Sequence, residues 1–290
     1  MSAVRILDRV IRPAPIGLRF RDVVTGLTVG AGLTVTVTSL RNPLRTKRLD
    51  VNRSGVWYAH RFPGLADQDL ADPVNWPALM QPYRISVDDA LGRFLPLRID
   101  MDLPVRGLVN WPGWSTVPQT LLAPLIDGAS ESPPDMTVCR DALPLFSSPE
   151  RSNPAPLAEI RCQLRRTDGE PASGALMTVS HSGTVRALGQ ADAEGRVAMF
   201  FAYPERPRAS LLTSPPAITD FRWSLDVRAY AAPLPANPTF ADIIDQLNHP
   251  RDLFASTASP PELLPSQLLS FGRPLTLRTT GSSVLMMAAS

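Results

Sequence analysis

The stretch LTVTVT, residues 33–38, alternates apolar and polar side chains at every step. In an extended strand successive side chains point to opposite faces, so Leu33, Val35 and Val37 would face a core while the threonines face solvent. The same alternation occurs in LRFR (18–21), LRIDMDL (97–103) and FRWSLDVRA (221–229). Strands with one buried and one solvated face are typical of antiparallel sheets, and we therefore expect an all-β fold of packed sandwiches.

The strand pattern occurs twice along the chain. LRFRDVVTGLTVGAGLTVTVTS, which starts at position 18, matches EIRCQLRRTDGEPASGALMTVSH, which starts at position 159. Aligning the turn glycines Gly26 and Gly169 gives an offset of 169 − 26 = 143 residues and places Leu33 on Leu176. The identity is weak, but the order of strands and turns is the same, which indicates an internal repeat.

Two further pairs of segments recur in the same order: NRSGVWYAHRFPG (52–64) with DAEGRVAMFFAYPE (192–205), and YRISVDD (83–89) with FRWSLDV (221–227). We therefore expect two tandem antiparallel β-sandwich modules, each with its own core. The first, residues 1–146, carries long loops rich in Trp and Pro. The second is residues 158–290, and the Ser- and Pro-rich segment 147–157 between them is predicted to be a linker.

The second module is predicted to end in a short helix and a hairpin. Thr239 can cap a helix whose third residue is Asp242, a spacing that allows a capping box. An apolar stripe would follow on one helix face: Phe240, Ile243, Ile244 and Leu247. The stripe could pack on its own sandwich or dock on a neighbouring molecule. Pro250 would stop the helix, and PLTLRTTGSSVLMM, residues 274–287, is predicted to form a hairpin around 280–282.

Charge is nearly balanced over the 290 residues, with 29 basic and 27 acidic side chains. This balance argues against a general nucleic-acid binder, which concentrates positive charge on one face. The densest basic stretch runs from Arg41 to Arg48 between two predicted strands and contains Lys47, the only lysine. It could be a solvated loop or a surface for an acidic partner.

Cysteine usage and hydropathy favour a cytoplasmic protein. Cys139 and Cys162 are the only cysteines, too few for a disulfide framework, and Cys162 alternates with Ile160 and Leu164 as a core residue would. The N-terminal stretch MSAVRILDRVIRP has charges within its apolar part, unlike a signal peptide. No run approaches the roughly 20 apolar residues of a membrane span.

The sequence contains no recognisable catalytic, cofactor or metal motif. It lacks a glycine-rich phosphate loop, a dinucleotide fingerprint, HExxH and GxSxG. Its three histidines, His60, His181 and His249, are far apart and in unlike contexts, and no Cys/His cluster has metal-ligand spacing. We therefore predict a protein that is not an enzyme and that uses no cofactor and no metal.

Tryptophans in proline-stiffened loops are the candidate binding residues. Trp76 precedes Pro77, and Trp111 and Trp114 flank the dipeptide Pro-Gly. A loop tryptophan can anchor a protein interface or form a platform for a sugar ring, and it can equally cover the end of a sandwich. All three interpretations stay open, and Trp76, Trp111 and Trp114 are the predicted partner-binding residues.

The segment SGVWYAHRFPGL, residues 54–65, followed by PYRISVDDALGRFLPLRI, resembles the carboxypeptidase-regulatory-like, prealbumin-like β-sandwich. In that family a glycine turn precedes an aromatic strand that ends in a Leu-Pro-Gly-like corner. Here Ser54-Gly55, the strand 56–60 and Phe62-Pro63-Gly64-Leu65 match it. The second module matches less well, because its corner is Tyr203-Pro204-Glu205.

The overall order, with GLRFRDVVTG near the start, LPLF (143–146) between the modules and FGRPLTLRTTG near the end, resembles an accessory protein of phage tail-like contractile injection systems. The resemblance implies a non-enzymatic structural or adaptor component that binds neighbouring subunits through β edges and loops, with further copies of itself as one alternative. It carries over no catalytic residue. The rival hypothesis is a carbohydrate-binding module that uses the loop tryptophans.

Overall fold

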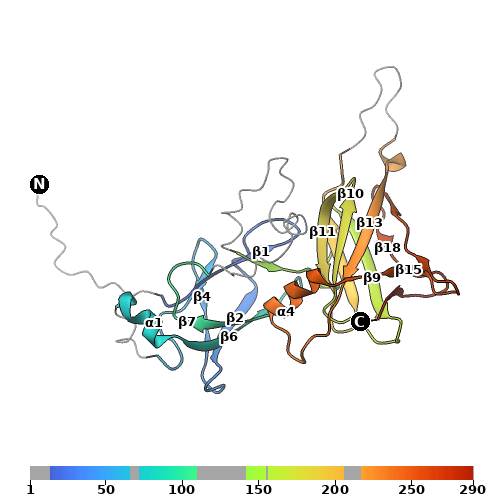
Figure 1. The fold of residues 1–290 in the computed structure, drawn as a ribbon. Coiled ribbons are helices and arrows are strands. Elements are labelled where there is room, and N and C mark those ends of the chain that lie inside the picture. The colour runs from blue at the N-terminus through green and yellow to red at the C-terminus, as the bar shows by residue number, and fades with distance from the viewer. Residues whose placement is uncertain (1–13, 66–71, 110–141, 155, 206–216, 290) are drawn as a thin grey trace, which may run out of the picture.

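The computed structural model describes residues 14–65, 72–109, 142–154, 156–205 and 217–289 (Figure 1). Nearly all of its regular elements are β-strands, and these form two modules, blue to green and yellow-green to red in the figure. The expected all-β class with tandem sandwiches is confirmed. None of the helices among these residues has the length and apolar composition needed to cross a membrane.

The first module consists of two four-stranded sheets. One has the order β4-β5-β1-β8 and the other β3-β2-β6-β7. β1 and β8 pair in parallel, and the other pairs between the described strands of these sheets are antiparallel. A short helical segment, η1 (Pro73–Asn75) and α1 (Trp76–Leu79), precedes β6. The strands are β1 (Gly17–Asp22), β2 (Leu33–Ser39), β3 (Thr46–Arg48), β4 (Asp50–Val51), β5 (Val56–Tyr58), β6 (Gln81–Asp89), β7 (Leu97–Leu103) and β8 (Leu143–Leu145).

The second module also consists of two sheets, joined to the first by the segment between β8 and β9. One sheet has the order β11-β10-β13-β14, with β17 also paired to β13, and the other has β12-β9-β19-β15-β16, with β18 also paired to β9. Its elements are β9 (Ala158–Arg166), β10 (Leu176–His181), β11 (Thr184–Gln190), β12 (Arg196–Phe201), η3 (Ile218–Asp220), β13 (Arg222–Tyr230), α4 (Phe240–Asp245), η4 (Gln246–Asn248), β14 (Pro250–Arg251), β15 (Leu253–Ser256), β16 (Glu262–Leu263), β17 (Gln267–Ser270), β18 (Leu275–Thr276) and β19 (Leu285–Met287).

The repeat in the sequence corresponds to a repeat in strand pairing. β1 pairs antiparallel with β5 and parallel with β8, just as β9 pairs antiparallel with β12 and parallel with β18 and β19. Leu33 of β2 pairs with Asp89 of β6, and its equivalent Leu176 of β10 pairs with Tyr230 of β13. The pairing therefore makes Asp89 of β6 equivalent to Tyr230 of β13. That position in β13 is three residues further along the chain than the one given by the sequence match of YRISVDD with FRWSLDV.

The glycine turns before β5 and β12 have the same construction. The carboxamide oxygen of Asn52 and a carboxylate oxygen of Asp192 each accept two backbone N–H groups of the turn, at 2.8–3.0 Å. Gly55 and Gly195 follow with φ of 73° and 78°, a region that favours glycine. A Cβ on Gly195 would lie 2.2 Å from the Leu164 carbonyl oxygen, so the turn also needs the missing side chain.

The corner predicted after β5, Phe62-Pro63-Gly64-Leu65, packs against β6 of the first module. The ring of Phe62 contacts the ring of Tyr83 edge-on, with centroids 4.9 Å apart. The Tyr83 hydroxyl donates a hydrogen bond of 2.6 Å to the Pro63 carbonyl, and burial raises the pKa of Tyr83 to about 12. In the second module Tyr203 contacts the rings of Trp223 and Phe271 at 5.3 and 4.6 Å. Both corners therefore close one end of a sandwich with aromatic contacts.

The C-terminal part differs from the prediction in one respect. The turn near Gly281 exists, but β18 and β19 do not pair with each other and instead lie one after the other along the same edge of β9. The buried side chain of Thr279 fixes the loop between β18 and β19. Its hydroxyl donates to the Phe254 carbonyl at 2.7 Å and accepts the Met286 N–H at 2.8 Å. The predicted hairpin is thus a strand interrupted by a loop that is fixed to β15.

Candidate functional site at the module junction

A buried ion pair joins β1 to the segment between the modules. The guanidinium of Arg151 donates to both carboxylate oxygens of Asp22, at 2.9 and 2.7 Å, and to the Ser147 hydroxyl at 3.0 Å. Both charged side chains are less than one tenth exposed. Burial alone would raise the pKa of Asp22, but the hydrogen bonds from Arg151 and the Val24 N–H, with the charge of Arg151, hold it below the ordinary value.

Arg151 also lies between aromatic rings of the two modules. Its guanidinium carbon is 5.2 Å from the ring centre of Phe94 in the first module and 5.8 Å from that of Phe200 in the second. Arg161 of β9 donates to the carbonyl oxygens of Pro149 and Arg151, which fixes the connecting backbone to the second module. The segment predicted to be a linker is therefore part of an ordered junction.

The helix α4 is a second component of the junction. Thr239 and Asp242 form the predicted capping box, and the apolar stripe of the helix is buried. The stripe belongs to one buried cluster that includes the core of the first module and three residues of the second: Leu176, Leu188 and Tyr230. Figure 1 shows α4 between the modules, and it contacts β7. The structure thus differs from the expectation of two separate cores, and the stripe packs against both modules.

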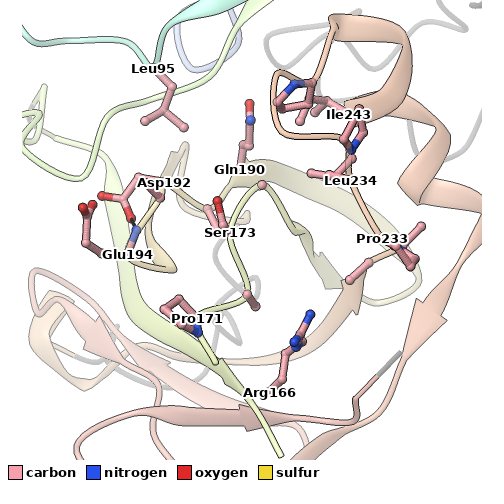
Figure 2. A pocket seen from close by; sticks show the side chains of 18 of the residues that line it. Leu95, Arg166, Pro171, Ser173, Gln190, Asp192, Glu194, Pro233, Leu234 and Ile243 are labelled. Carbon is pink, nitrogen blue, oxygen red and sulfur yellow. Dashed lines mark hydrogen bonds between the residues drawn. The ribbon is translucent and has the colours of Figure 1, made fainter. Parts of the chain in front are cut away.

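A groove of about 600 Å³ lies beside α4, lined by Leu95 and Pro96 of the first module and mainly by residues of the second (Figure 2). Small and apolar side chains dominate its wall, including five prolines: Pro96, Pro171, Pro233, Pro235 and Pro238. Its charged groups already have partners, because Asp192 and Glu194 lie 2.8 and 3.5 Å from Arg196 and Arg166 lies 2.8 Å from Asp168. Such a wall suits a short apolar segment better than a charged ligand.

The structure describes one of the three predicted partner-binding tryptophans. Trp76 lies in α1 within the core of the first module, with 3% of its surface exposed, so it covers the sandwich and offers no face to a partner or a sugar. Its indole N–H is buried and has no hydrogen-bond partner among the described residues. Trp111 and Trp114 lie outside the described residues, and their predicted role remains a prediction.

The remaining candidate residues have unrelated surroundings. Cys162 is buried, its thiol lies 3.4 Å from the Met177 sulfur, and burial raises its pKa to about 12, which confirms it as a core residue. His60 contacts the ring of Tyr58, and His181 is hydrogen-bonded to the carbonyl of Ser224. In the described part of the chain no three side chains of His, Cys, Asp or Glu gather as a metal site requires.

The basic stretch forms an exposed hairpin at a sheet edge. We call residues 39–48, the end of β2, the turn and β3, the basic hairpin. Its four cationic side chains are exposed: Arg41, Arg45, Lys47 and Arg48. At the turn, Leu44 is 95% exposed, and β3 is the outermost strand of its sheet. Both alternatives from the sequence, a solvated loop and an acidic-partner surface, are compatible with this placement.

Comparisons with known proteins assign no family. No family model and no curated protein matches the chain. Among solved structures, the chain is similar to the Bacillus anthracis TIE protein at 8% identity and a TM-score of 0.24, covering 94% of this chain and 33% of that one. It is also similar to the C-terminal fragment of the pilus adhesin SpaC from Lactobacillus rhamnosus GG, at 10% identity, a TM-score of 0.19 and coverages of 94% and 96%. The chain thus spans one third of the length of the TIE protein chain.

Proposed function

We propose that this chain is a non-enzymatic structural or adaptor component of a multi-protein particle of the phage tail-like contractile injection kind. In this role its two modules form one rigid unit, and neighbouring subunits bind to the sheet edges and loops of that unit. The observation that supports the proposal best is the junction, where Arg151 and α4 hold both modules in a fixed relation. A subunit that spaces its neighbours needs such a rigid body, whereas two modules on a free linker would not define a distance.

Exposed sheet edges are the second supporting feature. Among the described strands, β3, β4 and β16 are terminal strands of their sheets and consist of exposed residues. Unpaired edges can accept a strand from another chain, and proteins that stay monomeric usually shield them. Three such edges among the described strands of one rigid body suit a subunit with several neighbours.

The proposal is tested in the source cells by deleting the gene and examining purified particles by electron microscopy. Particles should be absent, shortened or incomplete, and the wild-type gene should restore them. As a test of rigidity, complementation with Arg151→Ala should restore fewer complete particles than complementation with Arg273→Ala, an exposed arginine remote from the junction. Complete particles in normal number from the deletion strain would contradict the proposal.

The rival role is carbohydrate binding through the loop tryptophans. The burial of Trp76 removes one of its three supports, while Trp111 and Trp114 remain. A glycan array separates the two roles. An adaptor should give no signal, and a signal that disappears in the Trp111→Ala/Trp114→Ala variant would favour the carbohydrate-binding role.

A further inference from the structure

We propose that the basic hairpin binds an acidic, extended segment of a partner protein, which adds to the free edge of β3 as a further strand. The inference rests on the proposed adaptor function and names the chemistry of one partner. It follows from three features of the hairpin: positive charge that forms no ion pair with a carboxylate of the described residues, an outermost strand and an apolar tip.

Positive charge is concentrated at this edge. Residues 41–53 contain five basic side chains and one acidic side chain, a net charge of +4, while the whole chain carries +2. In the described part of the chain none of Arg41, Arg45, Lys47 and Arg48 forms an ion pair with a carboxylate. Since like charges within one short segment repel each other, an acidic partner would relieve an unfavourable arrangement.

Several arginines elsewhere on the two modules form ion pairs. On the same sheet, Arg84 of β6 lies 2.7 Å from Asp100 of β7, and Arg93 lies 2.9 Å from Asp89. In the second module Arg196 lies within 4 Å of three carboxylates, those of Glu150, Asp192 and Glu194. The basic hairpin therefore lacks the carboxylate partners that these arginines have, and it gathers four exposed cations in the densest basic stretch of the sequence.

The strand register presents these charges to both sides of an incoming strand. In β3, Lys47 is opposite Val37 of β2, while Thr46 and Arg48 are opposite Thr38 and Thr36. Because side chains alternate along a strand, Lys47 points to one face of the sheet and Arg48 to the other. A peptide paired to the outer edge of β3 would meet a cation on each face, so acidic residues at neighbouring positions could both find a partner.

The same features favour a polypeptide over a nucleic acid or a membrane. A free strand edge offers N–H and C=O groups in the spacing of another strand, which a peptide backbone can match. The hairpin sequence SLRNPLRTKR contains no aromatic residue on which a base could stack. Its exposed apolar side chains at the tip, Leu40 and Leu44, fall short of the amphipathic surface of a membrane-bound element.

The direct test uses a fluorescent peptide that alternates Glu with Thr, a second that alternates Lys with Thr, and a third with Glu and Thr in which alternate backbone nitrogens are methylated. Fluorescence anisotropy should show binding of the first alone. Its affinity should fall by about tenfold or more as salt rises from 50 to 500 mM, because the contact is between exposed charges. Equal binding of the methylated peptide would overturn strand addition.

The single lysine allows the contact to be located. A water-soluble carbodiimide activates a Glu carboxylate of the peptide, and the Lys47 amine then attacks to form an amide while the carbodiimide leaves as its urea. Because Lys47 is the only lysine, coupled peptide other than at the N-terminal amine must be attached there. Mass spectrometry of proteolytic fragments should find the amide at Lys47, and coupling found only at the N-terminus would overturn the proposed site.

Charge reversal provides the matched control. Arg45→Glu/Lys47→Glu/Arg48→Glu should lose peptide binding by about tenfold or more. Arg186→Glu/Arg222→Glu/Arg228→Glu, which reverses three exposed arginines of the second module, should bind as the wild type does. Circular dichroism and the melting temperature establish that each variant is folded. Unchanged binding by the hairpin variant would overturn the inference.

Competition decides between partner classes and between hypotheses. A 20-base single-stranded DNA and vesicles of phosphatidylcholine with phosphatidylserine should compete with the acidic peptide only weakly. Stronger binding of either one than of the peptide would overturn the assignment to a protein partner. A hairpin variant that loses the peptide yet enters particles normally would overturn this inference alone, whereas normal particles without the chain would overturn the proposed function.

Discussion

Asp22 is the residue on which the junction depends most. Its carboxylate is buried, and the charge of that carboxylate is balanced by the Arg151 side chain, 129 positions away. The sequence offers no signal for this contact. Asp22 follows a strand as a turn residue would, and Arg151 lies in a Ser- and Pro-rich segment typical of linkers. Long-range ion pairs have no periodicity, so the strands could be predicted and this pair could not.

Arg151→Ala should therefore cost more stability than an ordinary surface substitution. It leaves a carboxylate buried without its cation, a change worth about 3–5 kcal/mol. Chemical denaturation of the variant, of Arg151→Lys and of the exposed control Arg273→Ala should give a large, an intermediate and a negligible loss. A loss below about 1 kcal/mol for Arg151→Ala would mean that water replaces the guanidinium.

The pH dependence of stability should report the same pair. The folded-state pKa of Asp22 is held below the ordinary value of 3.8, so the pair stabilises fully above that value and less as the pH falls through the folded-state pKa. In Arg151→Ala, burial without the cation should raise this pKa instead. The difference in unfolding free energy between wild type and variant should then shrink as the pH falls from the variant's raised pKa, above 3.8, through the wild type's lowered one. A difference that stays constant down to pH 3 would contradict this linkage.

Cys162 gives a further prediction at this scale. Burial raises its thiol pKa to about 12, so at pH 8 the folded protein should hold almost no thiolate there. In a Cys139→Ser background, alkylation by iodoacetamide should be slow in buffer and should accelerate at the denaturant concentration that unfolds the protein. Rapid alkylation in buffer would show that this core opens readily.

At the scale of elements, alternation predicts strands well and predicts their pairing poorly. The inward positions of LTVTVT are buried as expected, and the capping box begins α4 at Thr239. The prediction of a C-terminal hairpin was wrong, because a turn between two apolar segments does not specify which strand edge the segments pair with. Here the long strand β9 offers an edge to both β18 and β19, and Thr279 fixes the loop between them.

The turn glycines give a prediction at the scale of elements. Gly195→Ala introduces a left-handed alanine and a Cβ 2.2 Å from a backbone oxygen, whereas Gly169→Ala introduces a left-handed alanine in open space. Thermal denaturation should show about 1–2 kcal/mol of destabilisation for Gly169→Ala and clearly more for Gly195→Ala. Gly55→Ala, which meets only the movable methyl group of Thr28, should fall between them. Equal losses would show that the turn before β12 relaxes without cost.

At the scale of the whole molecule, the two modules share buried surface, so each depends on the other. The sequence predicts the duplication, because the duplication rests on local patterns. It does not predict that the face of α4 packs against both modules, since an apolar stripe fits a sandwich, a junction or a partner equally well. The groove beside α4 was missed for the same reason, because its Pro- and Ala-rich wall reads as ordinary loop sequence.

A fragment of residues 158–290 should consequently be less stable than the same module within the full chain. Without the first module, Phe240 and Ile243 lose part of the apolar surface that covers them. Differential scanning calorimetry should show one cooperative transition for the full chain and a transition at lower temperature for the fragment. Two independent transitions in the full chain, one matching the fragment, would contradict the shared core.

The parallel pair of β1 with β8 has a consequence for synthesis. Phe20 is translated long before its neighbour Leu143, so the nascent first module exposes one edge of β1 until the ribosome has made β8. Closing so long a loop is slow, and an open apolar edge attracts other strands meanwhile. Translation speed across the intervening codons therefore sets how long each new chain is vulnerable to misassembly, and a chaperone acting on this protein would be needed during that interval.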